Sequence, residues 1–337
     1  MTFHPGRIIL SLLAACPIAV CAASHDLYLA ASINASSRVM GARGEALDGI
    51  YARGPDNTYG HVGHHLPLLI TLAFDPRDST RVYGAGLSGV MRSADGGVTW
   101  RLVTGWQETE PKALALDAVN PDTVYAGLPD GFIVSDDCGE TWERREAGLP
   151  ERGKYTQTLQ VDRTRAGRVF AGCETGIYLT EDGARSWGRV FETVDTVNDI
   201  QQSPHDPAHW IAVSQSAGAL ESRDSGLTWA RLPQVPSEKA LYSVAFDPKQ
   251  RGRTAIAGWT LGIITSEDDG RTWTERNIGL PPLHRVWRTA VDPDDGRLYA
   301  AVYDNALYAS SDFGRTWKAI GMEASVIRNF IFVPRAR

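Results

Sequence analysis

The sequence predicts an all-β fold, a seven-bladed β-propeller of four-stranded antiparallel blades, from the spacing and form of one repeated motif. An octet of the form Ser/Thr-x-Asp-x-Gly-x-Thr/Ser-Trp occurs six times, at residues 93–100, 135–142, 180–187, 222–229, 266–273 and 310–317, with Ala184 in place of the glycine in the third copy. Successive copies start 42 to 45 residues apart. A fixed period of about 40–50 residues containing several short strands is typical of propeller blades.

The octet has the composition of a tight turn between two strands. A short apolar run such as Gly131–Ser135 precedes it, and its tryptophan opens the next strand. The aspartate can accept hydrogen bonds from turn amides, and the glycine adopts backbone angles that other residues resist. The tryptophan ring covers the hairpin with a large apolar surface. We therefore interpret the octets as structural turns, not as six active sites.

Two further strands are predicted before each octet. The first ends at an aspartate in residues 72–75, 114–117, 159–162, 244–247 and 289–292. The second follows a polar turn in residues 81–86, 123–127, 168–172 and 297–301. Short apolar runs bounded by Gly, Asp and Pro favour strands, and we expect the aspartates to cap the turns that follow them.

The two ends of the chain together predict the seventh blade. Residues 326–334 have the form of a first strand, 26–31 of a second and 47–53 of a third. Residues 53–59 hold a degenerate octet, in which Tyr59 stands where tryptophan would be. Joining the first strands to the last would remove the unpaired edges that an open ring leaves exposed.

The octets resemble the Asp-box, or bacterial neuraminidase repeat. This repeat is found in sialidases, sortilin-type receptors, large xyloglucanases and propellers of the photosystem II assembly-factor type. The resemblance extends from about residue 68 to residue 321 and implies a propeller. Because enzymes and binding proteins share the box, it leaves the function open.

Residues 1–23 predict a secretory signal peptide, followed by a single propeller domain at 24–337. Arg7 precedes an apolar stretch at 8–20, and small residues follow at the cleavage region. As an alternative, residues 13–16 resemble a lipobox that would leave a lipid anchor at Cys16. Both interpretations predict an extracytoplasmic protein, periplasmic or secreted, and no transmembrane segment in the mature chain.

Composition and motif spacing limit the classes of partner and bound group that we expect for this protein. A net charge of −6 argues against nucleic acid, whose phosphates require a basic surface. His61, His64 and His65 lack a convincing further ligand, so we predict neither a metal site nor a cofactor. Cys138 and Cys173 fall on opposite predicted faces, so no disulfide is expected between them.

The best candidate site is a polar ring at the mouth of the central channel, on the face opposite the octets. Irregular loops gather on that face, and such loops commonly carry binding residues. Aligning the first strands on their final aspartate brings together Lys112, Gln157, Asn198, Asp199, Tyr242, Trp287, Arg288 and Arg328. The cations could bind a polar or anionic group, with the two aromatic rings as flat contact surfaces.

Three alternatives accompany this ring. Its polar residues could simply face a water-filled channel, with Asp199 and Arg288 paired. Trp106 and Trp259 could stack on sugar rings from their own loops. Cys138 could be a reactive thiol, although an inert turn residue is the simpler interpretation.

For function, the resemblance to propellers of the photosystem II assembly-factor type implies a secreted or periplasmic, non-catalytic propeller that binds a protein or glycan ligand at the channel mouth and could serve as an assembly or stability factor. The alternative is a sialidase-like glycoside hydrolase acting on extracytoplasmic glycans. That alternative needs an arginine cluster, a tyrosine and acids, for which the residues available are Arg285, Arg288, Arg328, Tyr242, Tyr303, Glu108, Glu174 and Asp304. The Phe/Tyr-Arg-Ile-Pro element typical of sialidases is absent, no acidic pair is marked, and the catalytic residues stay unknown.

Overall fold

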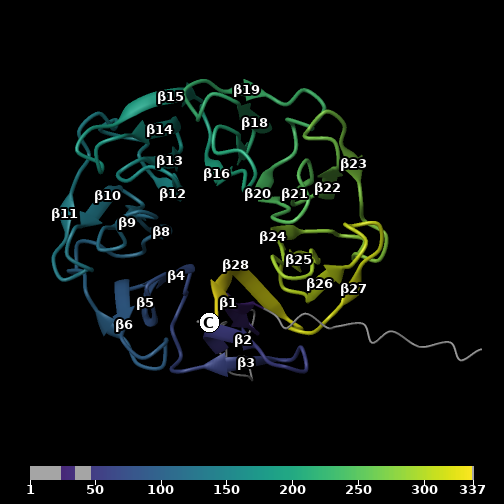
Figure 1. The fold of residues 1–337 in the computed structure, drawn as a ribbon, viewed down its shortest axis with the longest axis horizontal. Coiled ribbons are helices and arrows are strands. Elements are labelled where there is room, and N and C mark those ends of the chain that lie inside the picture. The colour runs from purple at the N-terminus through teal and green to yellow at the C-terminus, as the bar shows by residue number, and fades with distance from the viewer. Residues whose placement is uncertain (1–23, 35–46, 336–337) are drawn as a thin grey trace, which may run out of the picture.

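Seven four-stranded antiparallel sheets surround a central channel in this computed structural model, which describes residues 24–34 and 47–335 (Figure 1). In six sheets the strand order follows the chain, and in the seventh it is β28-β1-β2-β3. The predicted seven-bladed propeller is confirmed. Within those residues no helix is long and apolar enough to cross a membrane. The predicted signal segment 1–23 and Cys16 lie outside the described residues.

Each blade contributes one strand to each of four concentric positions. The inner strands are β4 (Thr71–Asp75), β8 (Ala113–Leu116), β12 (Thr156–Val161), β16 (Val197–Gln202), β20 (Leu241–Phe246), β24 (Val286–Val291) and β28 (Ser325–Pro334). The second strands are β5 (Asp78–Gly86), β9 (Val124–Leu128), β13 (Val169–Cys173), β17 (Trp210–Ser214), β21 (Thr254–Gly258), β25 (Leu298–Val302) and β1 (His25–Ile33). The third strands are β6 (Gly89–Ser93), β10 (Gly131–Ser135), β14 (Gly176–Thr180), β18 (Ala219–Ser222), β22 (Gly262–Ser266), β26 (Leu307–Ser310) and β2 (Leu47–Arg53). The outer strands are β7 (Arg101–Leu102), β11 (Glu143–Arg144), β15 (Gly188–Glu192), β19 (Ala230–Arg231), β23 (Thr274–Glu275), β27 (Lys318–Ala319) and β3 (Tyr59–Val62).

The seventh blade joins the two ends of the chain. Strand β28 pairs with β1 from His25 opposite Pro334 to Ile33 opposite Ser325, and β1 then pairs with β2. The buried side chains Leu27, Leu29 and Ile327 pack in one apolar cluster of this blade. The predicted closure of the ring is therefore confirmed.

All six octets form the same hydrogen-bonded turn. In the fourth copy the Ser222 hydroxyl donates to Asp224 at 2.7 Å and accepts from the Gly226 amide at 2.8 Å. The Thr228 amide and hydroxyl donate to the Asp224 carboxylate at 2.9 and 2.6 Å. The equivalent four bonds recur in the other five copies. The turn around Asp56 is shorter, because its carboxylate accepts from Thr58 only two residues away.

The octet tryptophans do more than cover their own hairpins. Trp100, like two others, donates its indole N–H to a carbonyl of its own turn. Trp187 and Trp317 donate instead to the carbonyls of Arg145 and Arg276, which follow the outer strands of the preceding blades. These two rings therefore join neighbouring blades, which the sequence pattern did not predict.

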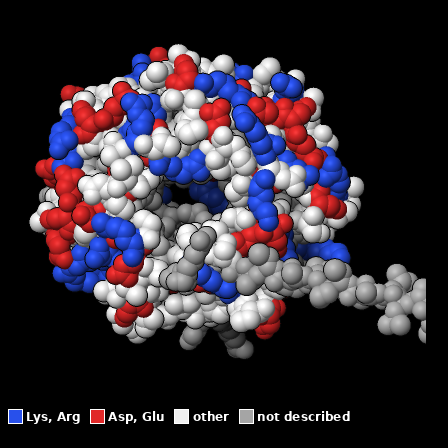
Figure 2. Space-filling view, viewed as in Figure 1, with Lys and Arg blue, Asp and Glu red and all other residues white. Residues whose placement is uncertain are grey.

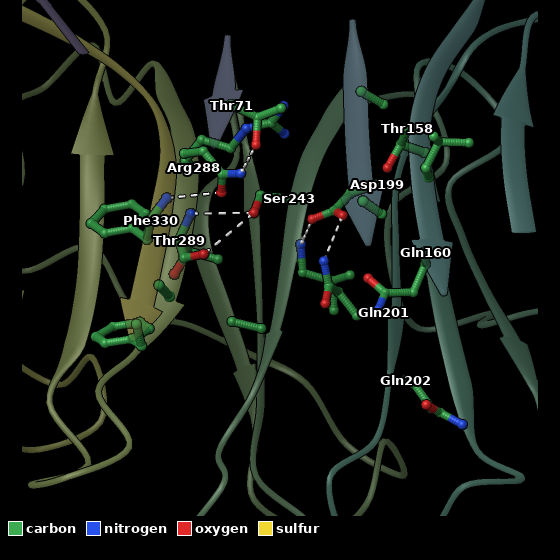
Figure 3. Close-up of a pocket in the computed structure, with 18 of the residues that line it drawn as sticks. Thr71, Thr158, Gln160, Asp199, Gln201, Gln202, Ser243, Arg288, Thr289 and Phe330 are labelled. Atoms are coloured by element: carbon green, nitrogen blue, oxygen red, sulfur yellow. Dashed lines mark hydrogen bonds between the residues drawn. The ribbon is translucent and has the colours of Figure 1, made fainter. Parts of the chain in front are cut away.

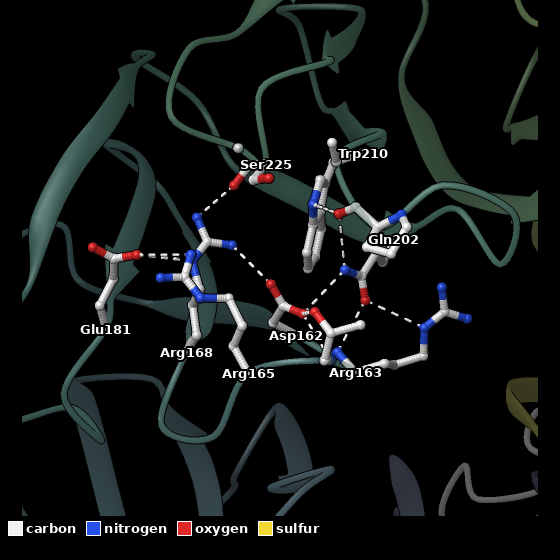
Figure 4. Close-up of polar contacts among 12 residues, drawn as sticks. Asp162, Arg163, Arg165, Arg168, Glu181, Gln202, Trp210 and Ser225 are labelled. Carbon is white, nitrogen blue, oxygen red and sulfur yellow. Dashed lines mark hydrogen bonds and ion pairs between the residues drawn. The ribbon is translucent and has the colours of Figure 1, made fainter.

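Asp162, which follows the inner strand β12, also connects two blades (Figure 4). Asp162 accepts from the Thr164 amide at 2.9 Å, as expected of a turn cap, and from the buried Arg168 at 3.0 Å. Gln202 of the next blade donates to the same carboxylate at 3.2 Å, while Arg168 donates to the Ser225 carbonyl of that blade. The other four predicted caps, Asp75, Asp117, Asp247 and Asp292, also accept the amide two residues later.

Removing one octet carboxylate should weaken the fold measurably. In Asp312→Ala the Thr316 amide and two hydroxyls lose their acceptor. Because this change resembles the removal of a capping side chain at a partly exposed site, we expect the free energy of unfolding to fall by about 1 kcal/mol. Chemical denaturation measures this, with Glu151→Ala as control because that exposed side chain makes no hydrogen bond among the described residues. Equal midpoints for Asp312→Ala and the control would contradict the role given to the octet.

Acid should remove the same contribution from several blades together. The threonine hydroxyl, and then its amide, holds the pKa of four octet aspartates at about 2, at Asp95, Asp137, Asp224 and Asp268. An unfolded aspartate titrates near about 3.9, so the stabilisation is complete above that pH and is lost as pH falls toward 2. Denaturation midpoints measured from pH 6 to 2 should therefore fall mainly below pH 4. A midpoint that is unchanged at pH 2.5 would refute this account.

Candidate functional site

Side chains from the inner strands of all seven blades meet in the central channel. It is a cavity of about 530 Å³ lined by side chains from β4, β8, β12, β16, β20, β24 and β28. In Figure 3 the Arg288 and Thr71 side chains lie toward one end of the channel and Gln202 toward the other. Arg288 lies near the start of β24 and Gln202 at the end of β16, so the end near Arg288 is the face that carries the connections between blades.

Five of the inner strands contain a β-bulge at the same place. One extra residue interrupts the pairing with the second strand at Gln157, Asn198, Tyr242, Trp287 and Arg328. These are members of the predicted polar ring. A bulge leaves its extra residue outside the ladder and redirects the side chain, and bulges are common beside binding sites. Sequence reasoning found the positions but not the bulges.

The predicted ring divides into two groups in space. Six of its residues line the channel: Lys112, Gln157, Asn198, Asp199, Arg288 and Arg328. Tyr242 and Trp287 are not among the lining residues, and they contact other aromatic rings beside the mouth. Tyr242 and Trp287 therefore lie beside the channel and not in its lining, although Gln157, Asn198 and Arg328, which are bulged in the same way, do line it.

The channel carries an excess of positive charge. Four basic side chains, Lys112, Arg163, Arg288 and Arg328, line it against the single acid Asp199, in a chain whose net charge is −6. Basic side chains are visible around the central opening in Figure 2. A low-dielectric wall of one charge sign concentrates the field inside a cleft and attracts ligands of the opposite sign.

Arg288 bridges two of the bulges. Its Nε donates to the Arg328 carbonyl at 2.8 Å and its Nη1 donates to the Tyr242 carbonyl at 2.6 Å. Among the described residues its Nη2 has no hydrogen-bond partner, and no carboxylate lies within ion-pair distance. Burial lowers the pKa of this guanidinium, an effect that the negative charge of Asp199 partly opposes. Arg288 thus presents a fixed cation without a paired anion to the channel.

Asp199 is occupied by neutral donors. Its carboxylate accepts from the Gln201 amide group at 2.9 Å and from the Val244 backbone amide at 3.0 Å (Figure 3). The structure contains no direct ion pair between Asp199 and Arg288, which was the alternative drawn from the sequence. Because the described lining includes no second acid, the channel does not supply the two facing carboxylates that most glycosidases use.

Four aromatic side chains form a cluster beside the channel mouth, and we call Tyr242, Trp259, Trp287 and Tyr303 the aromatic patch. The Tyr242 and Trp287 ring centres lie 4.7 Å apart, and those of Trp259 and Tyr303 lie 5.3 Å apart. Trp259 and Tyr303 come from the turns that follow β21 and β25. Tyr303 is 38% exposed and the other three are partly buried, so the patch forms part of the surface.

The backbone of Arg285 holds the patch together. Its amide donates to the Trp259 carbonyl at 2.8 Å, and its carbonyl accepts from the Tyr303 amide at 2.9 Å. The exposed Arg285 guanidinium lies 5.9 Å from the Trp259 ring centre, and that of Arg288 lies 5.7 Å from the Trp287 ring centre. Two blades therefore present a preformed aromatic surface flanked by two cations. The sequence analysis grouped Tyr242 with Trp287 but did not predict that Trp259, Tyr303 and Arg285 join them.

The remaining candidates do not converge. His61 and His65 both hydrogen-bond to the Asp48 backbone, and no three acidic, His or Cys side chains in the described ranges could hold a metal. Glu108 and Glu174 line two separate surface hollows. Trp106 is 83% exposed and makes no ring contact with the aromatic patch. Cys138 and Cys173 are free thiols, and burial raises the pKa of both.

Comparison with known proteins identifies two groups of relatives. A family model described as photosynthesis system II assembly factor YCF48 matches residues 65–334. The photosystem II assembly lipoprotein Ycf48 of Prochlorococcus marinus is 23% identical over 74% of this chain and 86% of its own length. An oligoxyloglucan-reducing end-specific xyloglucanase of Emericella nidulans is 27% identical over 53% of this chain. That match covers only 24% of the xyloglucanase, so about half of this chain matches about a quarter of that protein.

Solved structures support the fold in the same two groups. The GH74 enzyme of Niastella koreensis superposes with a TM-score of 0.67 at 16% identity, over 80% of this chain and 50% of the enzyme. A YCF48 structure bound to a D1 peptide superposes with a TM-score of 0.56 at 18% identity, over 75% and 82% of the two chains. At these identities the likeness concerns the propeller alone.

Proposed function

Because the chain belongs to the family of the photosystem II assembly factor YCF48, we propose that it is an extracytoplasmic, non-catalytic propeller that binds a segment of a client protein at its channel mouth. The family supports an assembly role, and one solved relative carries a bound peptide. What we propose is the class of ligand, a segment of a protein, and not the identity of the client.

One observation supports this proposal most directly, namely the basic channel mouth of an acidic protein. Lys112, Arg288 and Arg328 line the channel, and Arg288 keeps one guanidinium nitrogen without a partner among the described side chains. A partly buried cation is costly unless an anion compensates it. A carboxylate of a client segment would pair with Arg288 and regain that energy.

The proposed location rests on the N-terminal sequence and on a relative. Residues 1–23 have the pattern of a secretory signal, and the Prochlorococcus relative is named a lipoprotein. Either cleavage after residue 23 or a lipid anchor at Cys16 would place residues 24–337 outside the cytosol. A client in the envelope fits both routes.

Glycoside hydrolysis is the second candidate, favoured by the similarity to xyloglucanases. Against it, Asp199 is the only acid among the described residues that line the channel, and two separate hollows contain Glu108 and Glu174. A hydrolysis screen with xyloglucan oligosaccharides and sialosides distinguishes the two candidate functions. Only an enzyme would release products, and replacing its catalytic acid with the corresponding amide would abolish their release.

Charge reversal at the mouth should abolish client binding. Lys112→Glu places an additional acid in the channel beside Glu110, its present partner at 3.1 Å. We expect recovery of the client from the native envelope fraction to fall about tenfold or more, because a like charge at the docking surface opposes an acidic segment. The retained protein is identified by mass spectrometry, and its binding should also weaken with added salt.

Lys318→Glu is the matched control, since Lys318 is exposed on the outer strand β27, far along the blade from the channel. It makes the same change in net charge and should retain the client. Equal recovery by wild type and Lys112→Glu would refute the channel-mouth site. Both variants should unfold at the midpoint of the wild type.

A further inference from the structure

We propose that the client segment is acidic and extended, with a carboxylate bound at Arg288 and an aromatic side chain two residues away bound on the aromatic patch. This inference rests on the proposed function and deepens it. It assigns Trp259, Tyr303 and Arg285 to a second subsite beside the channel and specifies the sequence pattern of the ligand.

The aromatic patch is preformed. Tyr242 and Trp287 are bulged residues of adjacent inner strands, and the Arg285 backbone joins the turns that carry Trp259 and Tyr303. Fixed rings lose little conformational freedom when a ligand contacts them, so more of the contact energy appears as affinity. The Trp259 and Trp287 rings meet edge to face at 6.2 Å, and such angled faces suit another aromatic side chain.

The flanking charges select the sign of the ligand. Arg285 and Arg288 lie 5.9 and 5.7 Å from the two indole rings, and neither has an ion-pair partner among the described residues. A cationic ligand on the rings would be repelled by both guanidinium groups. An acidic peptide is instead attracted to them and to the basic channel, which gives the patch its charge complementarity.

The distance between the Arg288 subsite and the aromatic patch determines how many residues separate the two side chains of the ligand that bind there. The Arg288 guanidinium carbon lies 5.7 Å from the Trp287 ring centre. In an extended peptide, side chains two residues apart point to the same side at a separation of about 6.6–7 Å. Adjacent side chains point to opposite sides, so a carboxylate and an aromatic group at neighbouring positions could not occupy both subsites together.

Four blocked peptides test this pattern by calorimetry at low salt. The reference is acetyl-Gly-Ser-Asp-Ser-Phe-Ser-Gly-amide, in which both termini are neutral. One control replaces Asp with Asn, a second replaces Phe with Ala, and a third moves Asp next to Phe. We expect each change to weaken binding about fivefold or more, the scale of losing one central contact.

Protein variants locate the aromatic contact. Trp259→Ala and Tyr303→Ala should each weaken the reference peptide about fivefold but leave the affinity for the Ala-containing peptide unchanged, as expected when two groups interact directly. Tyr303→Phe should retain affinity because the ring is kept. Trp106→Ala is the matched control, an exposed tryptophan outside the patch that should change nothing.

The possible results separate this inference from the proposed function. If Asp-containing peptides bind equally with and without Phe, the aromatic subsite is wrong while the anionic mouth stands. If adjacent and alternate spacings bind equally, the register is wrong. If no acidic peptide binds, both proposals fail. Binding of xyloglucan oligosaccharides that depends on Trp259 would assign the patch to sugar and overturn the inference.

Discussion

Pairing between the first and last strands of the chain is the constraint on which the rest of the structure depends. Strand β28 is at once the inner strand of the last blade and the partner of β1, so the ring has no unpaired end at that junction. With the circle closed, each inner strand packs between two neighbours, and the side chains of all seven reach a common channel. The cationic mouth therefore depends on contacts such as that between His25 and Pro334, at opposite ends of the described chain.

Hydrogen bonds between neighbouring blades extend this constraint around the ring. Arg168 and Gln202 meet at Asp162 across one blade boundary, and Trp187 crosses another. At the mouth Arg288 performs the same task, because its guanidinium donates to the carbonyls of bulged residues in the blades on both sides. Arg288 thus joins the irregular backbone of two neighbouring blades and supplies part of the positive charge of the channel, which couples the stability of the mouth to its chemistry.

The parts of the structure that could be predicted from sequence are those determined locally. Each octet contains its donors and acceptors within eight residues, and the strand patterns around it follow a period that is visible without alignment. The bulges could not be predicted, since they reflect the register between strands and not the identity of residues such as Gln157 or Trp287. The aromatic patch was missed for a similar reason, because Arg285 brings Trp259 and Tyr303 together through backbone bonds.

Native-state hydrogen exchange tests the central constraint most directly. Amides paired between β1 and β28 should exchange with the same free energy as amides of the inner strand β24, within about 1 kcal/mol of global unfolding. The blade that closes the ring and the strands that line the channel would then unfold as one unit. Exchange of the β1–β28 amides at a free energy several kcal/mol lower, with β24 still protected, would contradict the claim that closure holds the channel together.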